Sequence, residues 1–335
     1  MERESLTAST ARFISSVAAE FNLAEVVSVV EMSSSSNCLW QFTTTKRIFV
    51  VKELPYNDAE QSFDLRKAAN FEATLIGEQR VLGPIPVQNR SGDYVAVLTD
   101  SRGKQSPVRL HHWFTGAPPC LDDPATLANA GRTLRAIQTA GAAWSVRPKG
   151  SLQRWHPDPS LVLEHFLVSG HFDGVSSTTL RHTVADALAL VHAGESMPGD
   201  WIYTHCDHKP ENCLSQDDVV AVLDWDECNY CHPRLEAVES ALRWAGINDP
   251  NPENFGAFMT GYNALGTPIE TLHAPDFAKW IAGLLEWFCF QARRTLGEWP
   301  EVTETERITA AVLARDALAT LQSSLTAIPR WTHLF

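Results

Sequence analysis

The first third of the chain alternates short apolar stretches with polar breaks, a pattern typical of β-strands. The stretches that predict strands are Val26–Val30, Leu39–Phe42, Ile48–Val51, Asp93–Leu98 and Val108–Phe114. Phe13, Val17 and Phe21 recur at helical spacing and predict a helix over Ser5–Phe21. A second helical stretch, Ala68–Leu82, falls between the third and fourth strands. This part of the chain is therefore expected to form a small sheet accompanied by one main helix.

Beyond residue 115 the apolar positions change to helical spacing. Asp123 and Pro124 begin a helix in the manner of an N-cap followed by a first-turn proline. Further helices are predicted around residues 127–137, 180–191, 234–246, 277–288 and 312–325. Two short strands, Trp201–Thr204 and Val219–Leu223, interrupt them. A chain of 335 residues exceeds one compact core, so we expect an α+β protein with two lobes, residues 1–115 and 116–335.

The segment between these two strands contains the most informative polar residues. Asp207 and Asn212 stand five positions apart, and the strand that follows ends at Asp224. Such residues in loops are usually turn formers that bond their own backbone. In this order, however, they match the needs of phosphoryl transfer from ATP, where one carboxylate meets the acceptor hydroxyl and two oxygen ligands hold magnesium. The ordered set therefore favours a kinase over a simple turn.

These residues resemble the aminoglycoside phosphotransferase family, the small-molecule branch of the protein-kinase-like fold. The family signature reads H-G-D-x-H-P-x-N-x-L and then I-D-W or I-D-F; residues 205–214 read H-C-D-H-K-P-E-N-C-L, and residues 223–226 read L-D-W-D. The resemblance implies a five-stranded antiparallel N-lobe sheet and a larger helical C-lobe. It implies that Asp207 is the catalytic base or hydroxyl-orienting residue and that Asn212 and Asp224 are magnesium ligands.

Two positions depart from the family signature. Cys206 replaces the usual Gly, and Lys209 stands where the family tends to have His. Lys209 instead resembles the catalytic-loop lysine of serine/threonine protein kinases, which approaches the transferred phosphate. Residues 224–226 are not D-F-G and no A-P-E segment follows, so a protein substrate is not expected.

The N-lobe holds the candidates for ATP binding. Lys52 ends a buried strand, where its charge must be paired or solvated, and it is predicted to hold the α- and β-phosphates. By resemblance, Glu72 is its predicted ion-pair partner, with Glu78 as the alternative. The polar loop over residues 32–37 is expected to cover the triphosphate, and Ser35 and Asn37 are its candidate ligands. The adenine-binding hinge is expected near residues 111–116. The residues whose backbone groups are candidates for bonding the adenine are His112, Trp113 and Phe114.

Charge is unevenly distributed along the chain. The net charge of the chain is -13. Residues 1–115 carry 13 acidic and 12 basic side chains, whereas residues 116–335 carry 27 acidic and 15 basic side chains, a net charge of -12. This field repels nucleic acid and anionic membranes and attracts cations. We therefore expect a small cationic acceptor, most plausibly an aminoglycoside or basic peptide antibiotic. The candidate carboxylates for its ammonium groups are Asp226, Glu227, Glu236 and Glu239.

Composition adds expectations about location and cysteine chemistry. No apolar run reaches the length of a membrane span, and the first residues lack the features of a signal peptide. Together with seven scattered cysteines, this predicts a cytoplasmic protein with reduced thiols. Cys228, Cys231 and His232 match the C-x-x-C-H haem motif, but haem attachment requires export, and a zinc site would need a fourth ligand such as His205. Both are treated as coincidence.

Two rival functions share the catalytic motif. A metabolic kinase for an amino alcohol or amino sugar, related to choline kinases, would use the same residues. A nucleotide-binding pseudokinase would act as an adaptor, although such proteins usually lose at least one of Lys52, Asp207, Asn212 and Asp224, and all four are present.

Overall fold

The chain folds into two compact units. The computed structural model describes residues 8–32, 38–54, 59–153, 157–170, 176–216, 219–247, 249–299 and 302–335. The first unit comprises Met1–Cys120 and Pro210–Asn229, and the second comprises Leu121–Lys209 and Tyr230–Phe335. The predicted division fell after residue 115 and assigned everything beyond it to the second lobe. In the structure, Pro210–Asn229 belong to the first unit, so the last part of the catalytic motif and the hairpin that follows it lie there.

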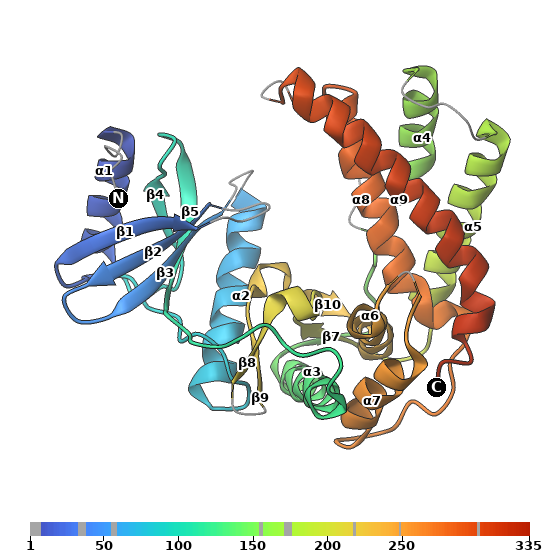
Figure 1. Cartoon of the computed structure of the whole chain (residues 1–335), viewed down its shortest axis with the longest axis horizontal. Helices are drawn as coiled ribbons and strands as arrows, with labels where there is room; N and C mark the ends of the chain where they lie inside the picture. Colours follow the sequence, from blue (N-terminus) through green and yellow to red (C-terminus); the bar gives the residue numbers. More distant parts are fainter. Residues whose placement is uncertain are drawn as a thin grey trace. The chain divides into compact units, whose positions relative to one another are not determined.

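A five-stranded antiparallel sheet forms the centre of the first unit (Figure 1), as predicted. Its strand order is β1-β2-β3-β5-β4. The strands are β1 (Val26–Met32), β2 (Cys38–Thr44), β3 (Ile48–Glu53), β4 (Ala96–Thr99) and β5 (Gln105–His112). In the register of β3 and β5, Lys52 lies opposite Arg109. Side chains opposite each other in adjacent strands share one face of the sheet, so these two cations project to the same side.

Two helices accompany this sheet. Phe13 and Val17 of α1 (Ala8–Glu20) are buried with Phe42 and Val51 of the sheet in one hydrophobic core. The main helix, α2 (Ala59–Gly77), begins nine residues earlier and ends five residues earlier than predicted. Its first turns have few apolar residues, so the pattern did not reveal them. Its end is fixed by a reversal at Gln79, which adopts a positive φ of 57°.

A hairpin of β8 (Cys213–Gln216) and β9 (Val219–Val222) completes the first unit. The Val222 N–H donates to the Leu82 carbonyl at 2.9 Å. Ala117 and Ser215 exchange backbone hydrogen bonds of 3.0 and 2.7 Å. These bonds explain why residues 210–229 belong to the first unit.

The second unit is mainly helical (Figure 1). Its helices are α3 (Pro124–Trp144), α4 (Pro159–Val168), α5 (Ser177–Glu195), α6 (Pro233–Ala245), α7 (Pro252–Asn263), α8 (Ala278–Thr295) and α9 (Glu304–Trp331). Its short strands are β6 (Val146–Arg147), β7 (Trp201–Thr204) and β10 (Asn229–Cys231). The apolar pattern of the sequence does not reveal α4, α7, β6 or β10.

Glycines allow α3 and α7 to approach each other closely. A Cβ atom at Gly131 would lie 2.0 Å from the Phe258 carbonyl oxygen, and one at Gly261 would lie 1.9 Å from the Ala128 carbonyl oxygen. Asp123 caps α3 as predicted, because its carboxylate accepts from the N–H groups of Ala125 and Thr126. Among the described residues, no helix combines the length and apolar character needed to cross a membrane.

Candidate active site

Lys52, the predicted phosphate-binding lysine, forms ion pairs at the end of β3. Its Nζ donates to Asp224 Oδ1 at 2.6 Å and also to Asp226 Oδ2. The Lys52 side chain is 12% exposed, whereas that of Asp224 is 38% exposed. The predicted lysine and the predicted metal-binding carboxylate are therefore in direct contact within the first unit.

Arg109 extends this ion pair into a buried network, which we call the Arg109 network (Lys52, Glu72, Arg109, Asp224 and Asp226). Its Nη1 donates to Asp226 Oδ1 at 2.6 Å, and its Nη2 donates to Glu72. The side chains of Arg109 and Glu72 are each 2% exposed. The expected Lys52–Glu72 pair is therefore replaced by a Glu72–Arg109 pair. Arg109 lies beside Lys52 on the sheet, and its planar guanidinium can bond both carboxylates.

The buried groups of this network keep their charges. Burial alone would raise the pKa of Glu72, but the charges of Arg109 and His111 outweigh it and hold the pKa below its ordinary value. The same balance, with Lys52 and Arg109 as the cations, lowers the pKa of Asp226. Burial would lower the pKa of Lys52, but Asp226 and Asp224 raise it. Each charged form is therefore stabilised by its partners in spite of burial.

The hairpin brings the two predicted metal ligands together. The Leu223 N–H donates to the Asn212 carbonyl at 2.8 Å, so Asn212 is bonded to the residue that precedes Asp224. Asn212 is buried and ends the 3-10 turn η1 (Pro210–Asn212). Asp224 adopts a left-handed conformation with φ 58° and ψ 62°. Carboxylate and amide oxygens are the ligands that magnesium takes, and the exposed fraction of Asp224 leaves its carboxylate reachable, so these residues fit a magnesium site.

Trp225 holds this loop against α2. Its side chain is fully buried, and its ring meets that of Phe71 edge-on, with the centroids 6.0 Å apart. The indole N–H donates to the Val222 carbonyl at 3.3 Å. The short turn η2 (Trp225–Glu227) thereby fixes the carboxylates at 224 and 226 on either side of a rigid aromatic anchor.

The predicted adenine-binding residues follow β5 directly. The N–H of His112 donates to the Ile85 carbonyl at 2.9 Å, and that of Trp113 donates to the Ile48 carbonyl at 3.0 Å. Both donors are thus already bonded within the first unit. Ser35 and Asn37 lie outside the described residues.

Asp207 and Lys209 lie in the second unit, in the loop after β7. Lys209 Nζ donates to Asp207 Oδ2 at 2.7 Å, and the two side chains are 26% and 19% exposed. The Asp207 N–H donates to His205 Nδ1 at 3.3 Å. Lys209 therefore holds one oxygen of the predicted catalytic carboxylate.

The residue before Asp207 is held from both sides. Cys206 adopts a left-handed φ of 64°. Its N–H donates to Glu236 Oε1 at 2.7 Å, and its carbonyl accepts from Lys279 Nζ at 2.7 Å. Glu236 also accepts from Thr204 and Gln138, each at 2.8 Å. Lys279 and Glu236 were not expected in this role.

The carboxylates proposed for ammonium binding are mostly engaged elsewhere. Asp226 bonds Lys52 and Arg109, and Glu236 is fully buried with the donors named above. Glu239 pairs with Lys279 and Arg243. Burial would raise the pKa of Glu239, but these two cations lower it to about 2. Glu227 is the exposed member of the four. Three of them would have to break internal bonds to bind an acceptor.

The cysteines of the C-x-x-C-H match are buried free thiols. Burial raises the pKa of Cys231, and its Sγ lies 3.6 Å from the His232 carbonyl oxygen. Within the described residues, no group of three or more His, Cys, Asp or Glu side chains is arranged to hold a metal ion.

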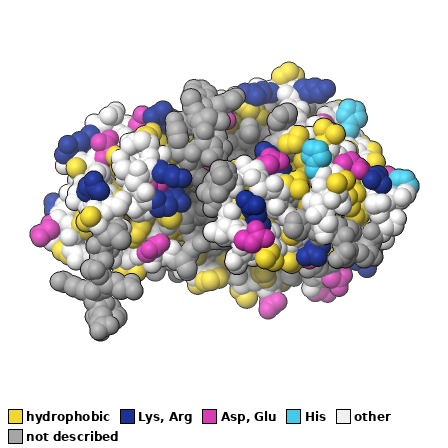
Figure 2. Space-filling view, turned by 90° about the horizontal axis from the view of Figure 1, so that it is seen from above, with side chains coloured by type: hydrophobic (Ala, Val, Ile, Leu, Met, Phe, Trp, Pro, Cys, Tyr) yellow, Lys and Arg dark blue, Asp and Glu magenta, His cyan; other side chains and the backbone are white. Residues whose placement is uncertain are grey.

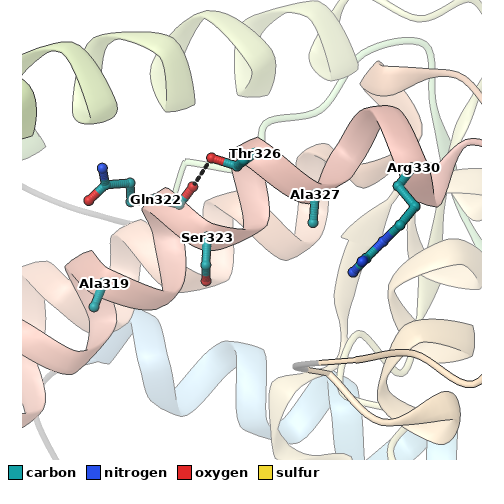
Figure 3. Close-up of a pocket in the computed structure, with 6 residues that line it drawn as sticks. All are labelled: Ala319, Gln322, Ser323, Thr326, Ala327 and Arg330. Atoms are coloured by element: carbon teal, nitrogen blue, oxygen red, sulfur yellow. Dashed lines mark hydrogen bonds between the residues drawn. The ribbon is translucent and has the colours of Figure 1, made fainter.

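Surface features add little to the site. On the face in Figure 2, Lys and Arg are interspersed with Asp and Glu, without one dominant acidic patch. A hollow on α9 is lined by small and polar side chains and by Arg330 (Figure 3). Its lining residues are Ala319, Gln322, Ser323, Thr326, Ala327 and Arg330. None of the predicted site residues lies there.

The sequence contains a signal for each of the two buried cations that were not predicted, Arg109 and Lys279. Arg109 interrupts the apolar stretch from Val108 to Leu110, and Lys279 stands between the apolar residues Ala278 and Trp280. A charge inside an apolar pattern requires a buried partner. The requirement that holds for Lys52 holds equally for Arg109 and Lys279.

Comparisons with known proteins agree with the motif. The family model described as "Phosphotransferase enzyme family" matches residues 31–269. No curated protein sequence matches significantly. Among solved structures, a spectinomycin phosphotransferase bound to ADP and spectinomycin is 11% identical with a TM-score of 0.62, covering 93% of this chain and 97% of that one.

Two further structures show the same fold. A microcompartment-associated aminopropanol kinase is 16% identical with a TM-score of 0.62, covering 96% and 99% of the two chains. A choline kinase from Streptococcus pneumoniae is 14% identical with a TM-score of 0.58, covering 92% and 99%. These likenesses confirm the predicted kinase-like fold, and the family match confirms the prediction of a small-molecule kinase. With 239 of its residues, 31–269, inside the family model, the chain belongs to the phosphotransferase enzyme family.

Proposed function

We propose that this phosphotransferase moves the γ-phosphate of ATP to a hydroxyl group of a small molecule. Lys52 binds the α- and β-phosphates, and Asn212 and Asp224 would hold magnesium, which would neutralise charge on the triphosphate. Asp207 orients the acceptor hydroxyl and takes its proton. The acceptor oxygen bonds to the γ-phosphorus while the bond to the bridging oxygen of ADP breaks. Lys209, bonded to Asp207, approaches the transferred phosphate.

One observation carries this proposal above the others. Lys52 bonds Asp224, and Asp224 follows the residue that bonds the Asn212 carbonyl. The cation proposed to bind phosphate and the two residues proposed to hold a hard metal are therefore linked in one bonded cluster, which supports these roles. ADP in the spectinomycin phosphotransferase structure supports ATP as the donor. A cytoplasmic location, expected from the sequence, would give access to it.

For the acceptor we first propose a small cationic antibiotic, such as an aminoglycoside or a basic peptide. The support is the net charge of -12 over residues 116–335, which attracts cations over long range. Asp226, Glu236 and Glu239 are held by internal bonds, so the proposal rests on the electrostatic field of the second lobe rather than on an ammonium contact to these three carboxylates. The second candidate is an amino alcohol, supported by the aminopropanol kinase and choline kinase structures that share the fold.

A transfer assay with purified protein tests the function. ATP, magnesium and individual acceptors (aminoglycosides including spectinomycin, choline and 1-amino-2-propanol) are incubated with enzyme, and phosphorylated product is identified by mass spectrometry. Asp207→Asn should lower turnover by about two to four orders of magnitude while leaving ATP binding intact by calorimetry. Asp186→Asn, an exposed change on α5, serves as the matched control. Equal turnover in Asp207→Asn would overturn the role of Asp207.

A further inference from the structure

Helix α8 exposes a pair of large aromatic side chains. Trp287 is 45% exposed and Phe290 is 43% exposed. Their rings are stacked, with centroids 5.7 Å apart and an interplanar angle of 27°. Phe290 also meets Trp299, which follows the helix, at 5.6 Å. We call Trp287, Phe290 and Trp299 the aromatic shelf. Large aromatic groups that cluster at a surface commonly mark a binding site.

The shelf continues a helical face that begins at the catalytic loop. Lys279, Gly283, Trp287 and Phe290 are spaced by four, four and three residues, so they share one side of α8. At one end of this face, Lys279 Nζ bonds the carbonyl of Cys206, the residue before Asp207. With a rise of 1.5 Å per residue, Trp287 lies about 12 Å farther along the axis. A small molecule can span such a distance.

The position between these two ends is open. In the part of the chain that the structure describes, a Cβ atom built on Gly283 would meet nothing within 4 Å. This glycine therefore serves no close helix contact, in contrast to Gly131 and Gly261. At its centre, the face that joins the catalytic loop to the shelf is thus not filled by atoms of the described residues.

The rings of the shelf favour a flat apolar group over a second cation. The Arg294 guanidinium lies over Phe290 at 5.6 Å, and the Arg293 guanidinium lies over Trp299 at 5.0 Å. Cation–π contacts to these two rings are already made within the chain. The exposed surfaces of Trp287 and Phe290 remain available for stacking and for burial of apolar area. A planar ring in the ligand is the group best suited to both contacts.

From this arrangement, and resting on the proposed function, we infer that the acceptor carries a flat apolar portion that stacks on Trp287 and Phe290. Its hydroxyl group is then presented to Asp207 at the other end of the helical face. The shelf thereby determines specificity: it favours ring-bearing hydroxyl compounds over short acyclic amino alcohols. A second copy of this chain is the competing occupant, and the experiment below separates the two.

A matched pair of alcohols tests the shelf. The compounds 1-heptanol and 6-phenyl-1-hexanol differ only by a methyl or a phenyl group at the end of the chain opposite the hydroxyl. Their binding is measured by calorimetry in the presence of ADP and magnesium. Wild-type protein should bind the phenyl compound about tenfold more tightly, since stacking and apolar burial of one ring are worth roughly that factor. Trp287→Ala should remove this preference and Trp287→Phe should retain most of it.

Two controls keep the result interpretable. Trp144→Ala removes another exposed tryptophan of the second unit, 40% exposed on α3, and should leave the preference unchanged. Sedimentation of wild type and Trp287→Ala reports on self-association. The inference is overturned if wild type shows no preference for the phenyl compound, or if Trp287→Ala keeps it. A dimer that becomes monomeric in Trp287→Ala with the preference intact would also overturn it.

The test separates this inference from the proposed function. If neither alcohol nor any other acceptor is phosphorylated, the transfer proposal fails. The preference for the phenyl compound and its loss in Trp287→Ala would still be observed, because binding of the ring requires only the aromatic shelf and not phosphoryl transfer. Conversely, phosphorylation of both alcohols with equal affinity would support the kinase and reject the shelf as its specificity determinant.

Discussion

Removal of the Arg109 guanidinium should destabilise the first unit strongly. Arg109→Met keeps an unbranched apolar stem but leaves Glu72, 2% exposed, and Asp226, 11% exposed, without this cation. Loss of one partner from a buried ion pair typically costs about 3–5 kcal/mol, because the remaining charge stays desolvated. Lys52 still compensates Asp226, so we expect a loss near the lower limit, about 3 kcal/mol.

Urea unfolding measures this loss directly. The free energy of unfolding of Arg109→Met is compared with wild type and with Arg181→Met, which breaks the exposed Arg181–Glu164 pair. The control should unfold as wild type does, because solvent screens exposed pairs. The double variant Arg109→Met/Glu72→Gln should recover part of the loss, since it also removes the stranded charge.

The pH dependence provides an independent check. The pKa values of Glu72 and Asp226 are lowered in the folded state, so their stabilising contribution is present above the unfolded-state pKa of about 4. It is lost as the pH falls below that value toward the folded-state pKa. In Arg109→Met the stranded Glu72 gains a proton more readily, so the difference from wild type should shrink on acidification. A loss below about 1 kcal/mol that does not vary with pH would refute this account of the network.

Two further predictions concern ligands. Asp224→Ala should abolish the tightening of ATP binding by magnesium in calorimetry, because it removes a carboxylate ligand; ATP affinity equal to wild type with and without chelator would place the metal elsewhere. If the acceptor is a polycation drawn by the charge of -12 over residues 116–335, its affinity should fall clearly between low and physiological salt, where charges are screened over about 8–10 Å. An affinity unaffected by salt would reject the cationic class.

Local pattern was sufficient to predict much of this fold. The five strands of the first sheet and the strand–loop–hairpin around Asp207 and Asp224 rest on short apolar runs bounded by turn residues, which are local signals. The helices α4 and α7 each bury apolar residues at helical spacing, but both are short, and α4 also exposes the apolar residues Leu161 and Val168. The start of α2 has few apolar residues. Such elements depend on tertiary packing, which overrides weak local preference.

The pairing of charges could not be read from the sequence in the same way. Glu72 and Arg109 are 37 positions apart, and Arg109 and Asp226 are 117 apart. The sequence suggested that Lys52 needed a carboxylate, but several carboxylates were available to it. The choice depends on the register of β3 and β5, which places Arg109 beside Lys52. A one-residue shift would have turned Arg109 to the other face of the sheet.

The two motif segments share a backbone feature that links fold and function. Cys206 immediately precedes Asp207, and Asp224 is itself a predicted metal ligand; both adopt the left-handed conformation with φ of 64° and 58°. For residues other than glycine this conformation costs about 1–3 kcal/mol and persists only where the surroundings enforce it. At Cys206 the enforcement is visible, because buried Glu236 holds its N–H and Lys279 holds its carbonyl. At Asp224 the bond from Leu223 to Asn212 and the buried Trp225 act on either side. Strain at these two positions is therefore stabilised by contacts that also fix the backbone next to the carboxylates at 207 and 224.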